Sequence, residues 1–333
     1  MRIVVDAMGG DRAPGVVVEG AVQAARDLDL ELVLVGQRGA VQSELDKHDT
    51  AGLSLTLQHA SQVIEMDEHP AAAVKAKKDC SMVVGMELLK RHEADGFFTA
   101  GNSGGALAAA LFRLGRIRGI KRPSISTVFP SQTRQGYCFL LDIGANADCR
   151  PEYLLQFAIM GSIYAERVLG VPNPRVAILS NGEEEGKGNQ LVLETTPLLK
   201  NSALNFVGNA EGKDICLGLA DVIVTDGFTG NVALKQAEGV AKFLLDLLKE
   251  EITGRSMSKV GGLLARPAFD EVKRRLDYRE YGGAPLLGVD GIVIIGHGRS
   301  DAKAIRNGIQ VAAQAVENSV LDAIKQGITR YQP

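Results

Sequence analysis

Short apolar runs that alternate with longer helical patterns most constrain what this chain can fold into. Most of the runs are apolar throughout, as is typical of strands buried on both faces of a parallel sheet. The predicted strands are Ile3–Asp6, Leu32–Val35, Leu53–Leu57, Gly96–Ala100, Ser124–Val128, Tyr137–Asp142, Val176–Ser180, Leu204–Val207, Val222–Thr225 and Ile292–Ile295. Their alternation with helices predicts an α/β fold, a three-layer α/β/α sandwich with a largely parallel sheet.

Two of the helical patterns are bounded by residues that start or stop helices. Pro14–Asp27 and Pro151–Leu169 both begin with proline, which suits the first helical position, and the second stops at Gly170. Val232–Ile252 and Ser300–Lys325 are two further predicted helices. We expect one catalytic unit over residues 1–333, with a division into two lobes placed near residues 146–151.

Composition and charge exclude several classes of protein. The chain has 333 residues, 45% of them hydrophobic, and a formal net charge of -3, which argues against a dedicated nucleic-acid-binding protein. Its 4 cysteines lack CxxC spacing, so a zinc site or disulfide framework is not expected. Asp6 comes too early for a signal peptide, and no apolar run approaches the ~18 residues of a membrane span. These features predict a cytoplasmic protein.

Glycine is unusually frequent, with 38 residues, and many of these glycines lie in polar turns that follow seven of the predicted strands. The turns are Ala7–Asp11, Gly101–Gly105, Ile143–Asn146, Asn181–Asn189, Gly208–Lys213, Asp226–Asn231 and Gly296–Asp301. In a parallel sheet they would gather at the carboxyl edge, where α/β proteins bind ligands. Glycine lets the backbone approach a ligand, and the helix that follows offers free N–H groups to an anion. The pattern predicts a site for an anionic ligand.

The turns do not match the usual nucleotide-binding motifs. Gly296–Asp301 has Asp where a dinucleotide fingerprint has its third glycine, and Asn181–Asn189 is one residue short of a Walker loop. Glu183, Glu184 and Glu185 are adjacent, so their side chains cannot all converge on one ion, and a solvated acidic turn is the simpler interpretation. We therefore expect neither a cofactor nor a metal.

One motif favours a different chemistry. Gly101–Gly105 reads GxSxG between a strand and a helix, as in the nucleophile elbow of an α/β-hydrolase. Ser103 would be the nucleophile, His297 the base, and Asp226 or Asp290 the third member of the triad. The HGGG-type oxyanion loop of such enzymes is missing from the sequence, so a serine hydrolase remains the second choice. A non-catalytic module that binds an anion or a carrier protein is a third.

The combined motifs resemble those of the bacterial phosphate acyltransferase (PlsX) family of phospholipid synthesis, over essentially the whole chain. The matching segments are Asp6–Asp11, Gly101–Gly105, Leu141–Asn146, Asn181–Asn189, Asp226–Asn231 and Gly296–Asp301. The resemblance implies a fold similar to phosphotransacetylases and isopropylmalate dehydrogenases, and a homodimer. It also implies a reaction in which long-chain acyl-[acyl-carrier-protein] and inorganic phosphate give acyl-phosphate and free carrier protein. A glycerol-3-phosphate acyltransferase would then consume the acyl-phosphate.

This chemistry assigns roles to residues of the turns. Phosphate attacks the thioester directly, so the enzyme must hold it against the carbonyl and stabilise the developing oxyanion. The expected phosphate-binding residues are Asn102, Ser103, Gly104, Thr229 and Ser300, and the expected catalytic residues are Lys187, Asn231, Asp226 and His297. Helix capping is the alternative role for Asp226, Asn146 and Asn189.

A long helix predicts an element that protrudes from the sheet. Val232–Ile252 would span over ~30 Å, whereas a six-residue strand spans ~20 Å. With Thr253–Pro267 and a helix Phe269–Tyr278 it would form a helical hairpin over residues 232–279. Its tip would dock acidic acyl carrier protein or the inner face of an anionic membrane through Arg255, Lys259, Leu263, Leu264, Arg266, Lys273 and Arg274, with Arg275 and Arg279 adding charge. A dimerisation or core-covering element is the alternative.

A second basic cluster contains no acidic residue. It consists of Arg113, Arg116, Arg118, Lys121 and Arg122. Because it follows a helix that starts at the ligand-binding edge, we expect it at the opposite edge of its own sheet, as a solvated surface patch. The alternatives are that it faces the partner's site in a dimer, and that it suits an acidic partner as the hairpin does.

Overall fold

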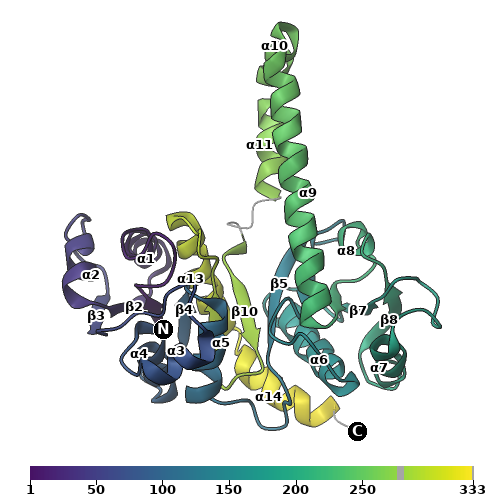
Figure 1. Ribbon diagram of the computed structural model, residues 1–333, viewed down its shortest axis with the longest axis horizontal. Coiled ribbons are helices and arrows are strands. Elements are labelled where there is room, and N and C mark those ends of the chain that lie inside the picture. Colours follow the sequence, from purple (N-terminus) through teal and green to yellow (C-terminus); the bar gives the residue numbers. More distant parts are fainter. Residues whose placement is uncertain (276–280, 332–333) are drawn as a thin grey trace.

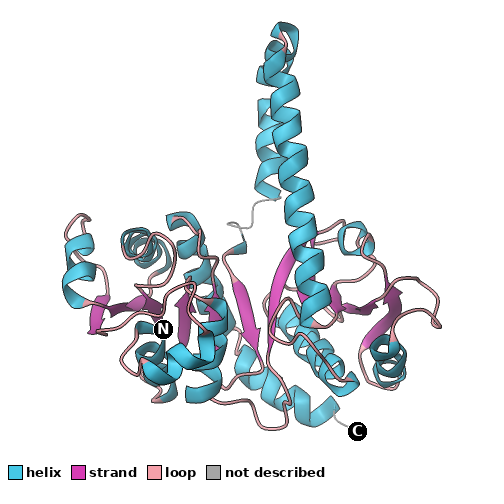
Figure 2. Ribbon diagram, in the orientation of Figure 1, coloured by secondary structure: helices cyan, strands magenta, loops and turns pink. Residues whose placement is uncertain are grey.

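Eleven strands form one continuous sheet in the computed structural model, which describes residues 1–275 and 281–331 (Figures 1 and 2). The strands are β1 (Arg2–Asp6), β2 (Glu31–Gly36), β3 (Leu55–His59), β4 (Gly96–Thr99), β5 (Ser124–Pro130), β6 (Tyr137–Leu141), β7 (Arg175–Leu179), β8 (Asn205–Ala210), β9 (Val222–Val224), β10 (Ala284–Leu287) and β11 (Ile292–Ile295). Their spatial order is β3-β2-β1-β4-β11-β10-β5-β6-β9-β7-β8. The first five strands of this order belong to one lobe and the last five to the other, with β10 between them.

The two lobes run their parallel strands in opposite directions. β1, β2, β3, β4 and β11 are parallel to one another. β6, β7, β8 and β9 form a second parallel set, but β6 is antiparallel to β5, β5 to β10, and β10 to β11. Three reversals leave the second set opposed to the first. The expectation that all seven glycine-rich turns gather at one edge is therefore wrong, because the carboxyl ends of the two sets lie at opposite edges of the sheet.

Helices cover both faces and make the three layers predicted from the sequence. They are α1 (Gly15–Leu28), α2 (Arg38–Leu45), α3 (Pro70–Ala76), α4 (Ser81–Lys90), α5 (Ser103–Arg113), α6 (Pro151–Arg167), α7 (Gln190–Lys200), α8 (Asp214–Leu217), α9 (Gly227–Gly254), α10 (Ser256–Leu264), α11 (Arg266–Arg275), α13 (Ala302–Glu317) and α14 (Val320–Tyr331). In the first lobe α1, α2 and α13 cover one face and α3, α4 and α5 the other. In the second lobe α6, α7 and α14 lie opposite α8 and the base of α9.

Adjacent residues of one strand illustrate why the strands are apolar throughout. Phe97 and Phe98 of β4 are both fully buried, but Phe97 belongs to the core under α3, α4 and α5, and Phe98 to the core under α1 and α13. In the second lobe Phe139 of β6 stacks on Tyr164 of α6 with ring centroids 4.7 Å apart. A strand buried on both faces needs apolar side chains at every position.

Three features of the fold differ from the sequence predictions. β10 was not predicted, because its four residues include a proline and give no helix or strand period. The helix expected over Ser300–Lys325 is two helices, broken at Ser319, which has φ 52°. Residues 146–151 connect β6 to α6 inside the second lobe, whereas the chain passes between lobes just before β5, at β10 and between α13 and α14.

The predicted hairpin is present as an arm that projects from the body (Figure 1). α9 is 28 residues long and continues past the sheet, while α10 and α11 turn the chain back along it. The expected helix Phe269–Tyr278 is described as α11 up to Arg275, and Arg279 lies outside the described residues. None of the described helices is long and apolar enough to cross a membrane.

Candidate active site

The turn after β6 is organised by one buried carboxylate. Asp142 is fully buried, and its two oxygens accept five hydrogen bonds. The donors are the backbone N–H groups of Ile125, Gly144, Ala145 and Asn146 and the Asn146 side-chain amide, at 2.8–3.2 Å. Burial raises the pKa of Asp142, and these hydrogen bonds oppose that rise because they stabilise the charged form.

The N-terminus of α9 rests on this turn. The Gly227 N–H donates to the Asn146 carbonyl oxygen at 2.7 Å, and the Asn231 side-chain amide donates to the Ile143 carbonyl oxygen at 2.9 Å. A Cβ added to Gly230 would overlap the Asp142 carbonyl oxygen, so only glycine permits this approach. The predicted catalytic residue Asn231 is thereby fixed relative to the strand end that carries Asp142.

Two of the residues for which helix capping was the alternative role, Asp226 and Asn189, are helix N-caps in the structure. Asp226 precedes α9, and its carboxylate accepts from the backbone N–H and the hydroxyl of Thr229 at 2.7 and 2.8 Å. Asn189 caps α7 by accepting from the Val192 N–H at 3.0 Å. Asn146 is not a cap, because its side-chain amide donates to the Pro123 carbonyl oxygen and to Asp142.

A second buried carboxylate, Asp6, organises the corresponding turns of the first lobe. Asp6 is fully buried, and it accepts from the Met8 N–H at 3.1 Å and from the Thr99 hydroxyl at 2.7 Å. Burial raises the pKa of Asp6. Thr99 in turn accepts from the Gly101 N–H at 3.0 Å, and a Cβ on Gly9 would lie 2.7 Å from the Gly101 nitrogen. The turns after β1 and β4 are therefore packed backbone to backbone.

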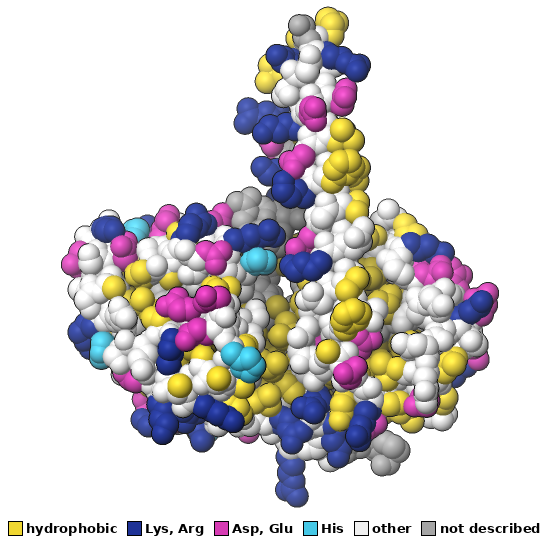
Figure 3. All heavy atoms as spheres, viewed as in Figure 1, with side chains coloured by type: hydrophobic (Ala, Val, Ile, Leu, Met, Phe, Trp, Pro, Cys, Tyr) yellow, Lys and Arg dark blue, Asp and Glu magenta, His cyan; other side chains and the backbone are white. Residues whose placement is uncertain are grey.

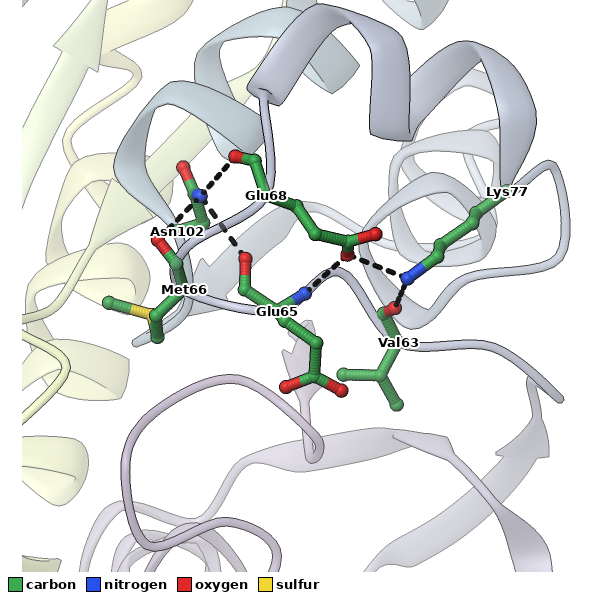
Figure 4. A network of polar contacts seen from close by, with 6 residues as sticks. All are labelled: Val63, Glu65, Met66, Glu68, Lys77 and Asn102. Carbon is green, nitrogen blue, oxygen red and sulfur yellow. Dashed lines mark hydrogen bonds and ion pairs between the residues drawn. The ribbon is translucent and has the colours of Figure 1, made fainter.

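The side chain of Asn102, a predicted phosphate-binding residue, makes structural contacts (Figure 4). Its amide donates to the carbonyl oxygens of Glu65, Met66 and Glu68 at 3.1–3.2 Å, and its oxygen caps α5 by accepting from the Gly105 N–H at 2.9 Å. Glu68 is held in turn by Lys77 at 2.6 Å. Ser103 and Gly104 form the first turn of α5 beside this network, with Ser103 exposed.

The turn after β11 meets α9 across the lobes. Arg299 of this turn lies 3.8 Å from Glu238 of α9, and Glu238 also pairs with Lys235 at 3.0 Å. Burial lowers the pKa of His297, as do the positive charges of Arg299 and Lys235. The Ser300 carbonyl oxygen accepts from Arg12 at 3.0 Å, which ties the turn to the end of β1. α9 thus spans from the turn after β6 to the turn after β11.

Sequence reasoning missed Lys235 and Glu238. They follow Asn231 by four and seven residues, and this spacing, which puts all three on one side of α9, could have indicated that they lie near the site. In the sequence, Asp6 and Asp142 were identified only as the ends of predicted strands. A carboxylate that ends a wholly apolar run and leads into a glycine-rich turn is the pattern that could have identified both as buried acceptors.

Lys187 stands apart from the other predicted catalytic residues. It is exposed in the turn after β7, and none of the described residues forms an ion pair with it. The turn itself is held by the Asn209 amide, which donates to the carbonyl oxygens of Gly182, Glu184 and Lys187 at 2.9–3.3 Å. β7 pairs with β9 in the sheet, so this turn is next to the turn that starts α9.

One group of carboxylates has the spacing of a metal site. Glu183, Glu211 and Asp214 place oxygens within 4.8 Å of one another. The Lys213 ammonium group lies 3.1 Å from Glu183 and 2.5 Å from Glu211, so two of the three carboxylates already share an ion-pair partner.

Comparison with known proteins decides the family. A family model described as fatty acid synthesis protein matches residues 1–323. A phosphate acyltransferase of Dictyoglomus turgidum is 53% identical over 331 residues, which are 99% of this chain and 98% of that protein. The chain belongs to the phosphate acyltransferase family. A second member, from Desulfitobacterium hafniense, is 50% identical over 332 residues, again 99% of this chain and 98% of the relative. This enzyme family acts in fatty acid and phospholipid synthesis.

Solved structures support the fold. A phosphotransacetylase from Streptococcus pyogenes superposes with a TM-score of 0.59 at 20% identity, covering 95% of this chain and 94% of that chain. The EutD phosphotransacetylase from Staphylococcus aureus gives 0.58 at 17% identity with the same coverage. The predicted similarity to phosphotransacetylases is confirmed for the architecture. Family membership also favours the acyltransferase over a serine hydrolase built on Ser103.

Proposed function

We propose that this phosphate acyltransferase converts long-chain acyl-[acyl-carrier-protein] and inorganic phosphate to acyl-phosphate and free carrier protein. A phosphate oxygen attacks the thioester carbonyl and forms the new C–O bond. The tetrahedral intermediate then breaks its C–S bond, and the carrier leaves as a thiolate that takes up a proton. Family membership over nearly the whole chain is the observation that carries this proposal.

The proposed reaction site is the space between the lobes along the first turns of α9. Asn231, fixed by Ile143, and the helix N-terminus that Asp226 caps would offer N–H groups to phosphate or to the developing oxyanion. Thr229 is a further proposed phosphate contact at this edge of the sheet. Ser103, Gly104 and Ser300, with Asn102 acting through its backbone because its side chain is engaged, lie at the starts of α5 and α13 at the opposite edge and would contact phosphate only from the other side of the space between the lobes. Lys187 is exposed and would neutralise charge once substrate is bound.

His297 is the proposed group for proton transfer to the departing thiolate. Its pKa is lowered by burial and by the positive charges of Arg299 and Lys235, so its protonated form is a stronger acid than that of an exposed histidine. It lies in the turn that contacts α9 through Arg299 and Glu238.

The hairpin is proposed as the element that brings the enzyme to a membrane. Met257, Leu263 and Leu264 of α10 are 85%, 69% and 79% exposed. Apolar side chains at the end of an arm suit peripheral insertion into an anionic bilayer, with Lys259 and Lys273 near the headgroups. There the poorly soluble acyl-phosphate would meet its glycerol-3-phosphate acyltransferase. A homodimer would use the apolar residues lower on α9, among them Val240, Phe243 and Leu247.

The decisive assay measures phosphate-dependent release of free carrier protein from acyl-carrier protein, with acyl-phosphate identified by mass spectrometry. The proposal expects stoichiometric acyl-phosphate and no free fatty acid at early times. Release of fatty acid without phosphate, together with labelling of Ser103 by a serine-reactive phosphonate, would instead establish the hydrolase.

A further inference from the structure

The loop formed by residues 114–123 lies at the same sheet edge as the start of α9. β5 is antiparallel to β6, with Ser126 opposite Leu141, so the segment before β5 extends past the carboxyl end of β6. Two hydrogen bonds join this segment to the turn after β6. The Asn146 amide donates to the Pro123 carbonyl oxygen at 2.7 Å, and the Ile125 N–H donates to Asp142 at 3.1 Å. The basic cluster is thus at the far edge of the first lobe but beside the proposed reaction site of the second.

The loop is held firmly in place. Gln156 of α6 is buried, accepts from the Lys121 N–H at 2.8 Å and donates to the Gly119 carbonyl oxygen at 2.9 Å. Ile117 and Ile120 are buried beneath the loop, at 3% and 4% exposure. Its cations are therefore presented from a fixed backbone, which lowers the entropy cost of binding a partner.

Four cations of the loop face solvent, and their charges are not compensated by ion pairs with described acidic residues. Arg116, Arg118, Lys121 and Arg122 are exposed, and none of them forms an ion pair with a described residue. Two neighbouring acids pair with other cations, Glu87 with Arg113 at 3.3 Å and Asp290 with Lys325 at 2.7 Å. Figure 3 shows Lys and Arg side chains gathered along the lower side of the molecule, opposite the arm.

The arginines of the hairpin differ in this respect, whereas Lys259 and Lys273 form no ion pair with a described residue. Arg255 pairs with Glu251 at 3.2 Å, Arg266 with Asp270 at 3.7 Å, and Arg274 with Glu271 at 2.8 Å. Intrahelical pairing reduces the positive field that these residues offer to a partner. The loop therefore has the stronger claim to an acidic protein.

We propose that the loop of residues 114–123 is the docking surface for the acidic carrier protein that delivers the acyl thioester. The inference rests on the proposed function for the identity of the partner, and on the loop's charge and position for the surface. A membrane is a poorer match, because the isoleucines of the loop are buried and offer no apolar anchor, and because the exposed apolar tip of the arm lies beyond the opposite edge. Complementary charge would steer the carrier to the edge where its thioester can reach α9.

The test reverses two loop charges. Arg118→Glu/Arg122→Glu is compared with Arg26→Glu/Lys47→Glu, which makes the same charge change at exposed positions near the outer edge of the first lobe. Purified holo acyl carrier protein is titrated against each enzyme at low salt. We expect Kd to rise at least tenfold for the loop variant and less than twofold for the control, with wild-type affinity falling as salt is added. Arg118→Gln/Arg122→Gln should show a smaller rise, and equal melting temperatures would confirm folding.

Kinetics separate docking from chemistry. The loop variant should raise KM for acyl-carrier protein at least tenfold, leave kcat within twofold, and turn over acyl-pantetheine, which lacks the protein, at the wild-type rate. Unchanged carrier affinity, an equal loss in the control, or loss of binding to anionic phospholipid vesicles with carrier affinity intact would overturn the proposal. Because the titration needs no turnover, a wild type that binds carrier but makes no acyl-phosphate would refute only the proposed function.

Discussion

Gly230 of α9 lies against the carbonyl oxygen of Asp142 with no room for a Cβ between them. This contact seats the first turn of the long helix on the turn whose N–H groups converge on the Asp142 carboxylate. The position of Asn231, and of everything the helix carries beyond it, depends on this contact.

Gly230→Ala should therefore destabilise the enzyme by about 3 kcal/mol or more, since a backbone carbonyl cannot yield as a side chain can. Urea unfolding measures the change. Gly239→Ala, in the same helix with open space around it, is the matched control and should stabilise by ~0.5–1 kcal/mol. Equal stabilities for the two variants would mean that the helix does not rest on this turn.

Asp142→Asn should cost ~2 kcal/mol or more, because the amide keeps one acceptor oxygen and turns a donor toward N–H groups that lose their partner. The same substitution at Asp226, which is nearer the surface and satisfies only Thr229, should cost about 1 kcal/mol. Thermal unfolding of both variants tests the difference, and a larger loss at Asp226 would contradict it.

Lys187→Ala and Asn231→Ala should each lower kcat/KM by ~10²–10³-fold with folding intact, as expected for removal of a group that stabilises developing charge. Lys249→Ala, an exposed lysine far along α9, is the control and should stay within twofold. Steady-state assays of acyl-phosphate formation decide. Near-wild-type values for both site variants would place the reaction elsewhere.

His297 gives a pH dependence whose direction follows from its environment. Burial, Arg299 and Lys235 lower its folded-state pKa below the ordinary value of 6.5. Its contribution to stability is therefore present above about pH 6.5 and lost as the pH falls through the folded-state pKa. His297→Gln should lose less stability than wild type over that descent. Urea midpoints at several pH values between about 7 and 5 measure this, and parallel losses would show that His297 is not the responsible group.

Leu263→Glu/Leu264→Glu should release the enzyme from anionic phospholipid vesicles in a flotation assay, because the two exposed side chains would insert into the bilayer. Leu198→Glu/Leu217→Glu changes exposed leucines of the second lobe and should float like wild type. Retained flotation of the tip variant would exclude the arm as the membrane contact.

The sequence was sufficient for the layers, for ten of the eleven strands and for the arm, because these depend on local patterns of apolar residues and on helix length. It was not sufficient for strand direction. β10 is a four-residue strand containing Pro285, and its antiparallel pairing is a long-range property that no local period records. Its two reversals cancel, and the antiparallel pairing of β5 with β6 is what opposes the two parallel sets and separates the glycine-rich turns into two groups.

The candidate site was predicted in part for the same reason. Asp226 and Asn231 follow a strand in one turn, so local pattern identified them. Lys235 and Glu238 are distinguished by their approach to Arg299, which comes from the other lobe and is more than sixty residues away in sequence. Proximity of this kind arises from tertiary packing and not from a motif.

β10 also sets the order in which the protein can be completed during synthesis. Its hydrogen-bonded neighbour β5 is about 160 residues earlier, as the bond from the Ser126 hydroxyl to the Pro285 carbonyl oxygen records. The first lobe likewise lacks β11 until almost the whole chain has been made. During synthesis β4 and β5 therefore each form an open edge of an incomplete sheet. Both edges are covered when β10 and β11, which follow the arm, have been made.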